Sequence, residues 1–257
     1  MIEFHTSYIT ETGRRQRNED ACGYWSSDAG CCWVVSDGAG GHGSGDKASR
    51  LVVSAVLESF SASPVVSEDR VINLLEAAHA AVMDEKRANP QGDDMHATVA
   101  ILLIDPRTQS AVWGHVGDSR VYLFRKRMLA HQTRDHSLVQ GMIDAGYGST
   151  EMIRTHPQRS LLTSAIGNSG ELALSVSGTP AMIEEGDAFL MCTDGWWEYV
   201  DEKTMESMLQ NSETAEEWLQ MMAAKVKQSE NDKSDNYTAM TIQAGDLEPV
   251  VTVILAK

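Results

Sequence analysis

Aspartates stand at the ends of the apolar segments of this sequence. Asp37 follows the run CCWVVS and precedes Gly38, and Asp194 follows the run FLMCT and precedes Gly195. Three further acidic positions adjoin other predicted strands, namely Asp118, Asp235 and the pair Glu19-Asp20. An aspartate directly after a buried strand is rigidly placed, and a following glycine lets a metal ion or ligand approach the backbone.

Carboxylates that converge in this way predict a site for divalent cations. Five aspartates brought together without partners are too costly to keep ionised, whereas two divalent cations offset most of their charge. Oxygen ligands without nearby Cys or His favour Mg²⁺ or Mn²⁺ over Zn²⁺. A single Asp-Gly pair is typical of an ordinary turn, so the prediction depends on the recurrence of such carboxylates at several strand ends.

Short apolar segments and segments with helical periodicity must position these carboxylates. The pattern predicts strands over residues 4–10, 21–25, 31–36, 97–105, 110–116, 120–124, 161–165, 172–177, 188–192 and 237–243, and a β-like tail over 250–255. It predicts helices over residues 44–60, 68–89, 135–145, 149–154, 202–209 and 214–229. The second helix is expected to start after an N-cap at Ser67 and to stop before Pro90.

The order of these segments predicts an α+β fold. Consecutive strands joined by tight turns favour antiparallel sheets over a βαβ arrangement. The long helices occur in pairs, which we expect to cover two mostly antiparallel sheets from outside, as a four-layer α-β-β-α sandwich. Since the sequence shows neither a repeat nor a linker, we expect a single domain over residues 1–257.

The composition argues against several other classes of protein. Hydrophobic residues make up 42% and charged residues 23% of the chain, which is ordinary for a globular protein and rules out wholesale disorder. A net charge of −16 argues against binding to nucleic-acid phosphates, for which clustered Lys and Arg are needed. The longest apolar run, residues 97–104, is far shorter than the roughly 20 residues that cross a bilayer, so we expect no membrane contact.

Cysteine usage and the N-terminal residues indicate a compartment. The first 20 residues contain no apolar stretch typical of a secretory signal. The four cysteines form no C-x-x-C pair, and the adjacent Cys31 and Cys32 are expected to point to opposite faces of a strand. We therefore expect reduced, buried thiols and a cytoplasmic protein, which we expect to be a monomer.

Six strings of the sequence, taken in order, resemble one known family. They are GRRQRNEDA (13–21), SDGAGGH (36–42), GDSR (117–120), DHSLV (135–139), TDG (193–195) and DN (235–236). Each is weak alone, but the ordered set resembles the metal-dependent PPM (PP2C-type) serine/threonine phosphatases in their compact bacterial form. The resemblance covers residues 5–243, and the fold that it implies is the same α-β-β-α sandwich.

The resemblance implies a two-metal centre. In such enzymes Asp37 would bridge two Mn²⁺ or Mg²⁺ ions, Asp194 and Asp235 would hold the first ion, and the carbonyl of Gly38 would hold the second. Glu19 would act on the second ion through water.

Three further residues complete the implied site. Asp20 would order water at the first ion. Asp118 would bind a third, weaker ion together with Asp194. Arg15 would grip the substrate phosphate, because a guanidinium fork binds two phosphate oxygens at once; the alternative is an exposed arginine of the RRQR cluster.

The reaction implied is hydrolysis of phosphoserine and phosphothreonine esters. A metal-bridged hydroxide would attack phosphorus in line, without a covalent phosphoenzyme. No cysteine stands in the C-x5-R frame of cysteine-based phosphatases. Eukaryotic relatives carry a histidine after the bridging Asp-Gly where this chain has Ala39, which leaves the acid for the leaving group open between His42 and water.

Residues 135–160 match the family's flap beside the active site. Within it we expect His136 to be structural. Two aromatic residues, Trp196 and Trp197, replace the small or aliphatic residues common after the Asp-Gly at 194–195, and we expect them to pack a helix on the sheet.

The resemblance also implies partners, and alternatives stay open beside it. Phosphorylated proteins and a cognate Ser/Thr kinase are the expected partners, and a secretion-system kinase pathway is a further possibility that the family offers. One alternative is a catalytically weak regulatory or binding member that acts on one dedicated partner. Another is a phosphatase of small molecules, which turnover of phosphothreonyl peptide against sugar phosphates would distinguish.

Overall fold

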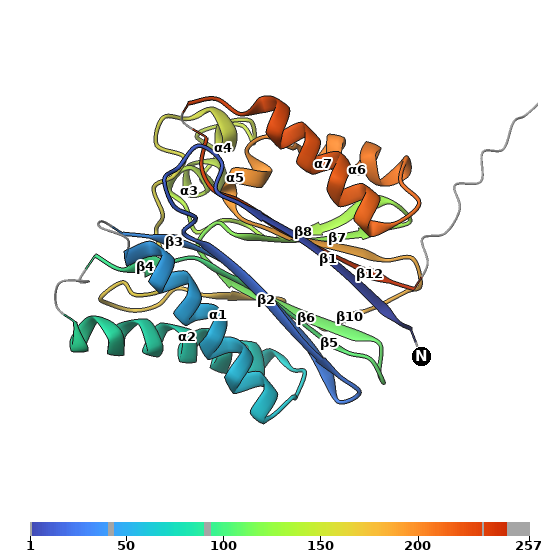
Figure 1. Cartoon of the computed structure of the whole chain (residues 1–257), viewed down its shortest axis with the longest axis horizontal. Helices are drawn as coiled ribbons and strands as arrows, with labels where there is room; N and C mark the ends of the chain where they lie inside the picture. The colour runs from blue at the N-terminus through green and yellow to red at the C-terminus, as the bar shows by residue number, and fades with distance from the viewer. Residues whose placement is uncertain (1, 41–43, 90–93, 233, 246–257) are drawn as a thin grey trace, which may run out of the picture.

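The computed structural model describes residues 2–40, 44–89, 94–232 and 234–245. Within these ranges two antiparallel sheets pack face to face, with helices on both outer sides (Figure 1). The expected α-β-β-α sandwich is confirmed. The expected tail over 250–255, Pro90 and His42 lie outside the described residues.

The two sheets differ in size. The five-stranded sheet has the order β1 (Phe4–Glu11), β12 (Tyr237–Ala244), β11 (Ala188–Cys192), β7 (Arg120–Arg125) and β8 (Met128–Gln132). The other has the order β10 (Ala181–Met182), β6 (Ser110–Val116), β5 (Val99–Asp105), β3 (Gly30–Ala39) and β2 (Asp20–Ser27), with β4 (His96–Ala97) on β3 and β9 (Ser175–Val176) on β6. Strand β1 lies at one edge of the five-stranded sheet, and β2 lies at one edge of the other sheet.

The helices fall into three groups. The pair α1 (Ser44–Ala62) and α2 (Glu68–Ala88) covers the sheet that contains β3, and the pair α6 (Glu202–Gln210) and α7 (Ala215–Ser229) covers the other sheet (Figure 1). The short helices α3 (Leu138–Asp144), α4 (Met152–Thr155) and α5 (Asp194–Trp197) lie together at one end of the sandwich. Ser67 caps α2 as predicted, since its Oγ accepts a hydrogen bond from the Arg70 amide at 3.1 Å.

Three apolar cores account for the layer order. Along β3, Cys32 and Val34 belong to the core shared with α1 and α2, whereas Cys31, Trp33 and Val35 face the other sheet. Successive side chains of a strand point to opposite faces, so a strand that is buried on both faces has a continuous apolar sequence. The third core lies between the five-stranded sheet and the pair α6 and α7.

The prediction failed mainly between residues 126 and 182. Residues 161–165 form no strand and make only an isolated bridge between Leu162 and Ser137, and the strand expected over 172–177 is reduced to β9. Strands β8 and β10 were not predicted. The turn before β8 is formed by Lys126 and Arg127 at φ 51° and 61°, where asparagine and glycine are the usual residues.

None of the helices in the described ranges is long and apolar enough to cross a membrane.

Candidate active site

The predicted carboxylates meet at one end of the sandwich. Asp20 opens β2 and lies opposite Asp37 of β3 in the antiparallel ladder. Asp194 begins α5 directly after β11, and Asp235 lies just before β12, the neighbour of β11. Asp118 lies in the turn between β6 and β7. All four of the other aspartates lie close enough to Asp37 to raise its pKa.

Burial and mutual repulsion raise the pKa of these carboxyl groups. Burial is the largest cause of the high pKa of Asp37, followed by the charges of Asp20 and Asp194. The pKa of Asp194 is also raised, by burial first and by the charge of Asp118 second. Burial also raises the pKa of Asp20 and that of Asp118 to about 7. Cations among these groups would reverse the effect, because a positive charge favours the ionised form.

Two buried carboxylate oxygens have no hydrogen-bond partner in the described part of the chain. They are Oδ1 of Asp20 and Oδ1 of Asp194. The other oxygen of Asp20 accepts a hydrogen bond from Thr193 Oγ1 at 2.9 Å. A buried oxygen without a donor is costly, and a hard divalent cation would satisfy it. The all-oxygen donor set therefore fits Mg²⁺ or Mn²⁺.

The carboxylates of the cluster lie near enough to one another to interact electrostatically. Among the described residues, no three His, Cys, Asp or Glu side chains are already gathered as a metal-binding group.

Two glycines let the backbone segments of the site approach closely. A Cβ on Gly38 would lie 1.9 Å from the carbonyl oxygen of Gly45 and 2.7 Å from that of Glu19. A Cβ on Gly195 would lie 2.0 Å from the carbonyl oxygen of Asn236. All three distances are shorter than van der Waals contact, so packing requires the glycine of each Asp-Gly pair.

Asn236 joins the loop after β1 to the start of β12. Its Nδ2 donates to the carbonyl oxygens of Thr12 at 2.7 Å and Arg17 at 2.8 Å, and its Oδ1 accepts from the amide of Glu19 at 2.8 Å. The sequence marked Asn236 only as the neighbour of Asp235. The structure shows that its side chain holds the loop that carries Arg15, Glu19 and Asp20.

Arg15 lies at the predicted site but is engaged with a carboxylate. Its Nη2 donates to Asp235 Oδ2 at 2.6 Å, and both side chains are substantially exposed. Glu19 lies in the same neighbourhood, because burial raises its pKa first, and the charges of Asp46 and Asp235 raise it further.

Asp118 is held in place by a buried network that the sequence did not reveal. Its carbonyl oxygen accepts from Trp197 Nε1 at 2.9 Å. The guanidinium of Arg120 stacks 3.7 Å from the Trp197 ring and binds Asp135 through two hydrogen bonds of 2.8 and 2.7 Å. Arg120 is 1% exposed and also donates to Tyr122. The GDSR string contained Arg120, but its partners are distant in the sequence.

The segment 135–160 is anchored on α5. Arg154 Nε donates to the carbonyl oxygen of Trp197 at 2.9 Å, and Arg159 makes two hydrogen bonds to Glu198. Trp196 and Trp197 are both buried in the core under α6 and α7, as predicted.

His136 has structural partners. Its Nδ1 accepts from the Gly117 amide at 3.2 Å, its Nε2 pairs with Ser175 Oγ at 2.9 Å, and its ring stacks on His115. It thereby fixes the turn that precedes Asp118.

Comparisons with known proteins identify the family of the chain. The family described as Protein phosphatase 2C matches residues 11–237. The serine/threonine phosphatase Stp of Listeria monocytogenes is 28% identical over 244 residues, which are 93% of this chain and 95% of that protein.

Solved structures of phosphatases superpose on most of the chain. The crystal structure of the Mycobacterium tuberculosis serine/threonine phosphatase PstP/Ppp has a TM-score of 0.80 at 28% identity and covers 96% of this chain and 100% of its own. The catalytic domain of PstP in complex with two manganese ions has a TM-score of 0.79 at 24% identity, with the same coverage.

One further structure is that of PppA, described as a key regulatory component of the T6SS in Pseudomonas aeruginosa. It has a TM-score of 0.71 at 25% identity and covers 94% of this chain and 97% of its own. Together, the matched family and these phosphatase relatives place the chain in the protein phosphatase 2C family, as a serine/threonine phosphatase of the bacterial form.

Proposed function

We propose that the carboxylate cluster of this phosphatase holds two Mn²⁺ or Mg²⁺ ions. Asp37 is shared by both ions, Asp194 and Asp235 belong to the first, and the Gly38 carbonyl and Glu19 belong to the second. The buried, unpartnered Oδ1 of Asp194 and the raised pKa of Asp37 carry this proposal. The two manganese ions in the PstP structure support it.

Two other aspartates have supporting roles in this proposal. Asp20 orders water at the first ion, and its buried Oδ1 is available for that purpose. Asp118 binds a third, weaker ion together with Asp194. The support for this role is the mutual repulsion of the two groups, since the charge of Asp118 is the second cause of the raised pKa of Asp194.

When bound, the cations lower the pKa of water and offset the charge of the phosphoryl oxygens. Arg15 leaves Asp235 and binds two oxygens of the phosphate, which a planar guanidinium fork suits. Its exposed position lets the side chain move between the two partners at little cost. Ala39 offers no proton for the leaving alkoxide, and we propose water as the donor.

We propose direct attack by water, with no covalent phosphoenzyme. The four thiols do not favour covalent catalysis by a cysteine. Cys31, Cys32 and Cys192 are buried, and burial raises the pKa of Cys22 to about 11. A nucleophilic cysteine needs a lowered pKa.

The substrates of a serine/threonine phosphatase are phosphorylated proteins, and we propose a cognate Ser/Thr kinase that supplies them. The likeness to PppA supports a narrower proposal, a kinase of a secretion-system pathway. We also propose that the chain acts as a monomer in the cytoplasm, as one phosphatase domain whose residues 135–160 form the flap.

Phosphate release from a phosphothreonyl peptide tests the proposed metal centre. We expect turnover with Mn²⁺, loss of turnover in EDTA, and loss in Asp194→Asn at any Mn²⁺ concentration. Glu213→Gln, at an exposed position in the loop between α6 and α7, is the matched control and should be fully active. Turnover that persists in EDTA or in Asp194→Asn would contradict the proposal.

A further inference from the structure

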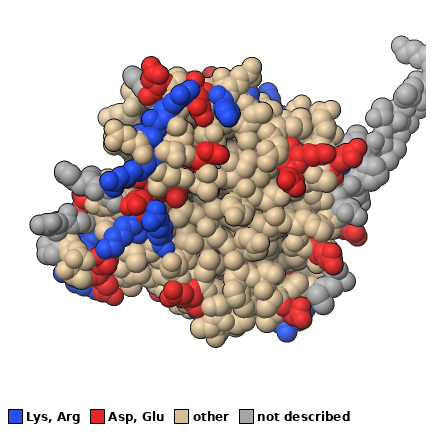
Figure 2. All heavy atoms as spheres, in the orientation of Figure 1, with Lys and Arg blue, Asp and Glu red and all other residues tan. Residues whose placement is uncertain are grey.

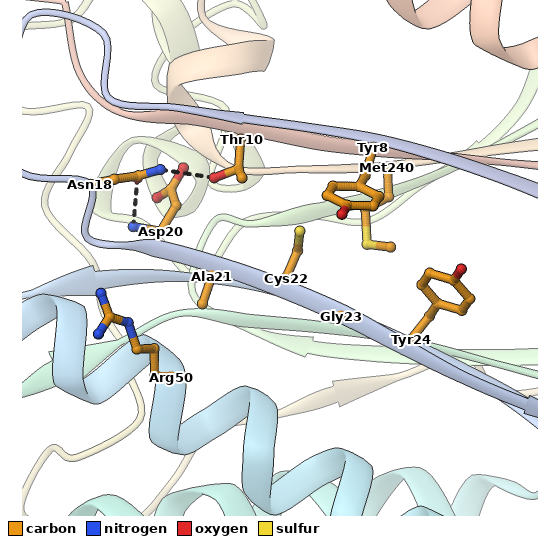
Figure 3. A pocket seen from close by; sticks show the side chains of 10 residues that line it. All are labelled: Tyr8, Thr10, Asn18, Asp20, Ala21, Cys22, Gly23, Tyr24, Arg50 and Met240. Atoms are coloured by element: carbon orange, nitrogen blue, oxygen red, sulfur yellow. Dashed lines mark hydrogen bonds between the residues drawn. The ribbon is translucent and has the colours of Figure 1, made fainter.

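A groove begins beside the candidate active site and runs along the open seam between the two sheets. Its first part is a cavity of about 420 Å³ whose lining includes Asp20, Cys22 and Tyr24 of β2, with Tyr8 of β1 and Met240 of β12 (Figure 3). A second cavity of about 520 Å³ continues it toward Trp33, and Tyr24 lines both. The groove therefore starts at a residue of the carboxylate cluster and follows β2.

Two exposed tyrosines stand on opposite walls of this groove. Tyr8 is 57% exposed and Tyr24 is 49% exposed, and Figure 3 shows them on β1 and β2 with Cys22 and Met240 nearby. Thr6 hydrogen-bonds Trp33 of the other sheet at 2.9 Å, so Tyr8, two residues later, points to the same side. Aromatic rings in such positions provide a large contact area for a bound side chain.

The walls are also the free edges of both sheets. β1 and β2 are the terminal strands in their sheet orders. Edge strands present backbone N–H and C=O groups to which an extended polypeptide can bind. A long groove bounded by two strand edges therefore suits an extended chain better than a compact small molecule.

The charged residues that line the groove lie toward its two ends, Asp20 and Arg50 in the first cavity and Glu3 and Asp28 in the second. Figure 2 shows the middle of this face largely without charged residues, whereas Lys and Arg gather at one end of it. Between the two ends lie the exposed side chains of Tyr8 and Tyr24, and exposed large hydrophobic side chains gathered in one place mark interaction sites.

We propose that this seam groove binds an extended segment of the phosphoprotein substrate, with a large apolar or aromatic side chain between Tyr8 and Tyr24. The inference rests on the proposed function, because the phosphorylated residue lies at the carboxylate cluster. Asp20 and Tyr24 are four positions apart on β2, or roughly 13 Å at the rise of a strand. An extended substrate covers that distance in about four or five residues, so the apolar residue stands at that spacing from the phosphoresidue.

Kinetics of two substrates test the groove. We expect Tyr8→Ala/Tyr24→Ala to lower kcat/KM about tenfold, through KM, for a phosphothreonyl peptide with phenylalanine at the predicted spacing. p-Nitrophenyl phosphate is too small to reach the groove, so its kinetics should be unchanged. Met182→Ala, at the opposite edge of the sheet that contains β2 and 60% exposed, is the control and should match wild type on both substrates.

A peptide series tests the spacing. One phenylalanine is moved from position 1 to position 7 on either side of the phosphothreonine. We expect a maximum of kcat/KM at four or five residues on one side, and loss of that maximum in the double tyrosine variant. No positional maximum, or equal losses on peptide and p-nitrophenyl phosphate, would overturn the proposal.

Binding without turnover separates this inference from the proposed function. Anisotropy of a fluorescein-labelled, unphosphorylated copy of the best peptide is measured with the wild-type protein in EDTA. We expect about tenfold weaker binding to the double tyrosine variant, and equal binding would overturn the groove whatever the outcome of the catalytic assays. Inactivity of the wild type on p-nitrophenyl phosphate with Mn²⁺ would instead count against the metal centre.

Discussion

Removal of divalent cations should make this protein less stable as the pH rises through neutrality. Burial raises the pKa of Asp20 and that of Asp118 from 3.8 to about 7 in the metal-free fold. Between those values the folded state holds a proton that the unfolded state has lost. The resulting stabilisation is present at low pH and is lost as the pH rises through the folded pKa.

The structure sets the size of this effect. Between pH 6.5 and pH 8, a carboxyl group with a folded pKa near 7 lowers the free energy of unfolding by about 0.8 kcal/mol. Asp20 and Asp118 together give about 1.6 kcal/mol on the same basis. Asp37 and Asp194, whose pKa values are raised well above the usual value, add to this loss.

Urea unfolding at the two pH values, followed by tryptophan fluorescence, measures the effect with EDTA and with Mg²⁺. Burial lowers the pKa of His115 to about 4, so its contribution rises with pH and opposes that of the carboxylates. His115 is no ligand of the proposed ions, so its contribution cancels between the two samples. We expect the Mg²⁺ sample to gain stability relative to the EDTA sample from pH 6.5 to pH 8. An unchanged or shrinking difference would refute the reasoning.

Three substitutions test other parts of the structure. Gly195→Ala places a Cβ 2.0 Å from a backbone carbonyl oxygen and should cost about 1–3 kcal/mol in urea unfolding, whereas Gly141→Ala, with nothing within 4 Å, should not destabilise. Asp135→Ala removes both hydrogen bonds of the buried Arg120 to Asp135, leaving Glu202 at 3.5 Å as its carboxylate partner, and should cost about 3–5 kcal/mol; a loss below 1 kcal/mol would contradict the buried pair. Arg15→Lys should lower kcat/KM on phosphopeptide roughly tenfold to a hundredfold with unfolding unchanged; unchanged kinetics would exclude Arg15 from phosphate binding.

Local signals predicted much of the fold. The cap at Ser67 and the bounds of β6 and β11 depend on neighbouring residues, and the structure has them where the sequence placed them. Strand β8 escaped detection because its residues are mostly exposed at a sheet edge, which removes the apolar signal. The expected strand over 161–165 was wrong because a short apolar run cannot reveal whether a neighbouring strand will pair with it.

The carboxylates of the site could be predicted from the sequence, whereas the residues that position them could not. Each aspartate carries its own signal, since it adjoins an apolar strand. The role of Asn236 requires three segments to meet, and that of Arg120 requires Trp197 to stack on it. Tertiary contacts of this kind leave no trace in the spacing of residues.

The number of Mn²⁺ ions that the protein binds tests the central claim most directly. Electron paramagnetic resonance of free Mn²⁺ counts the bound ions during a titration, and phosphopeptide turnover is measured on the same samples. We expect at least two ions in the wild type, with turnover rising as they bind, and loss of both binding and turnover in Asp37→Asn. Full turnover in Asp37→Asn, or turnover in the wild type before any Mn²⁺ binds, would contradict a metal centre built on Asp37.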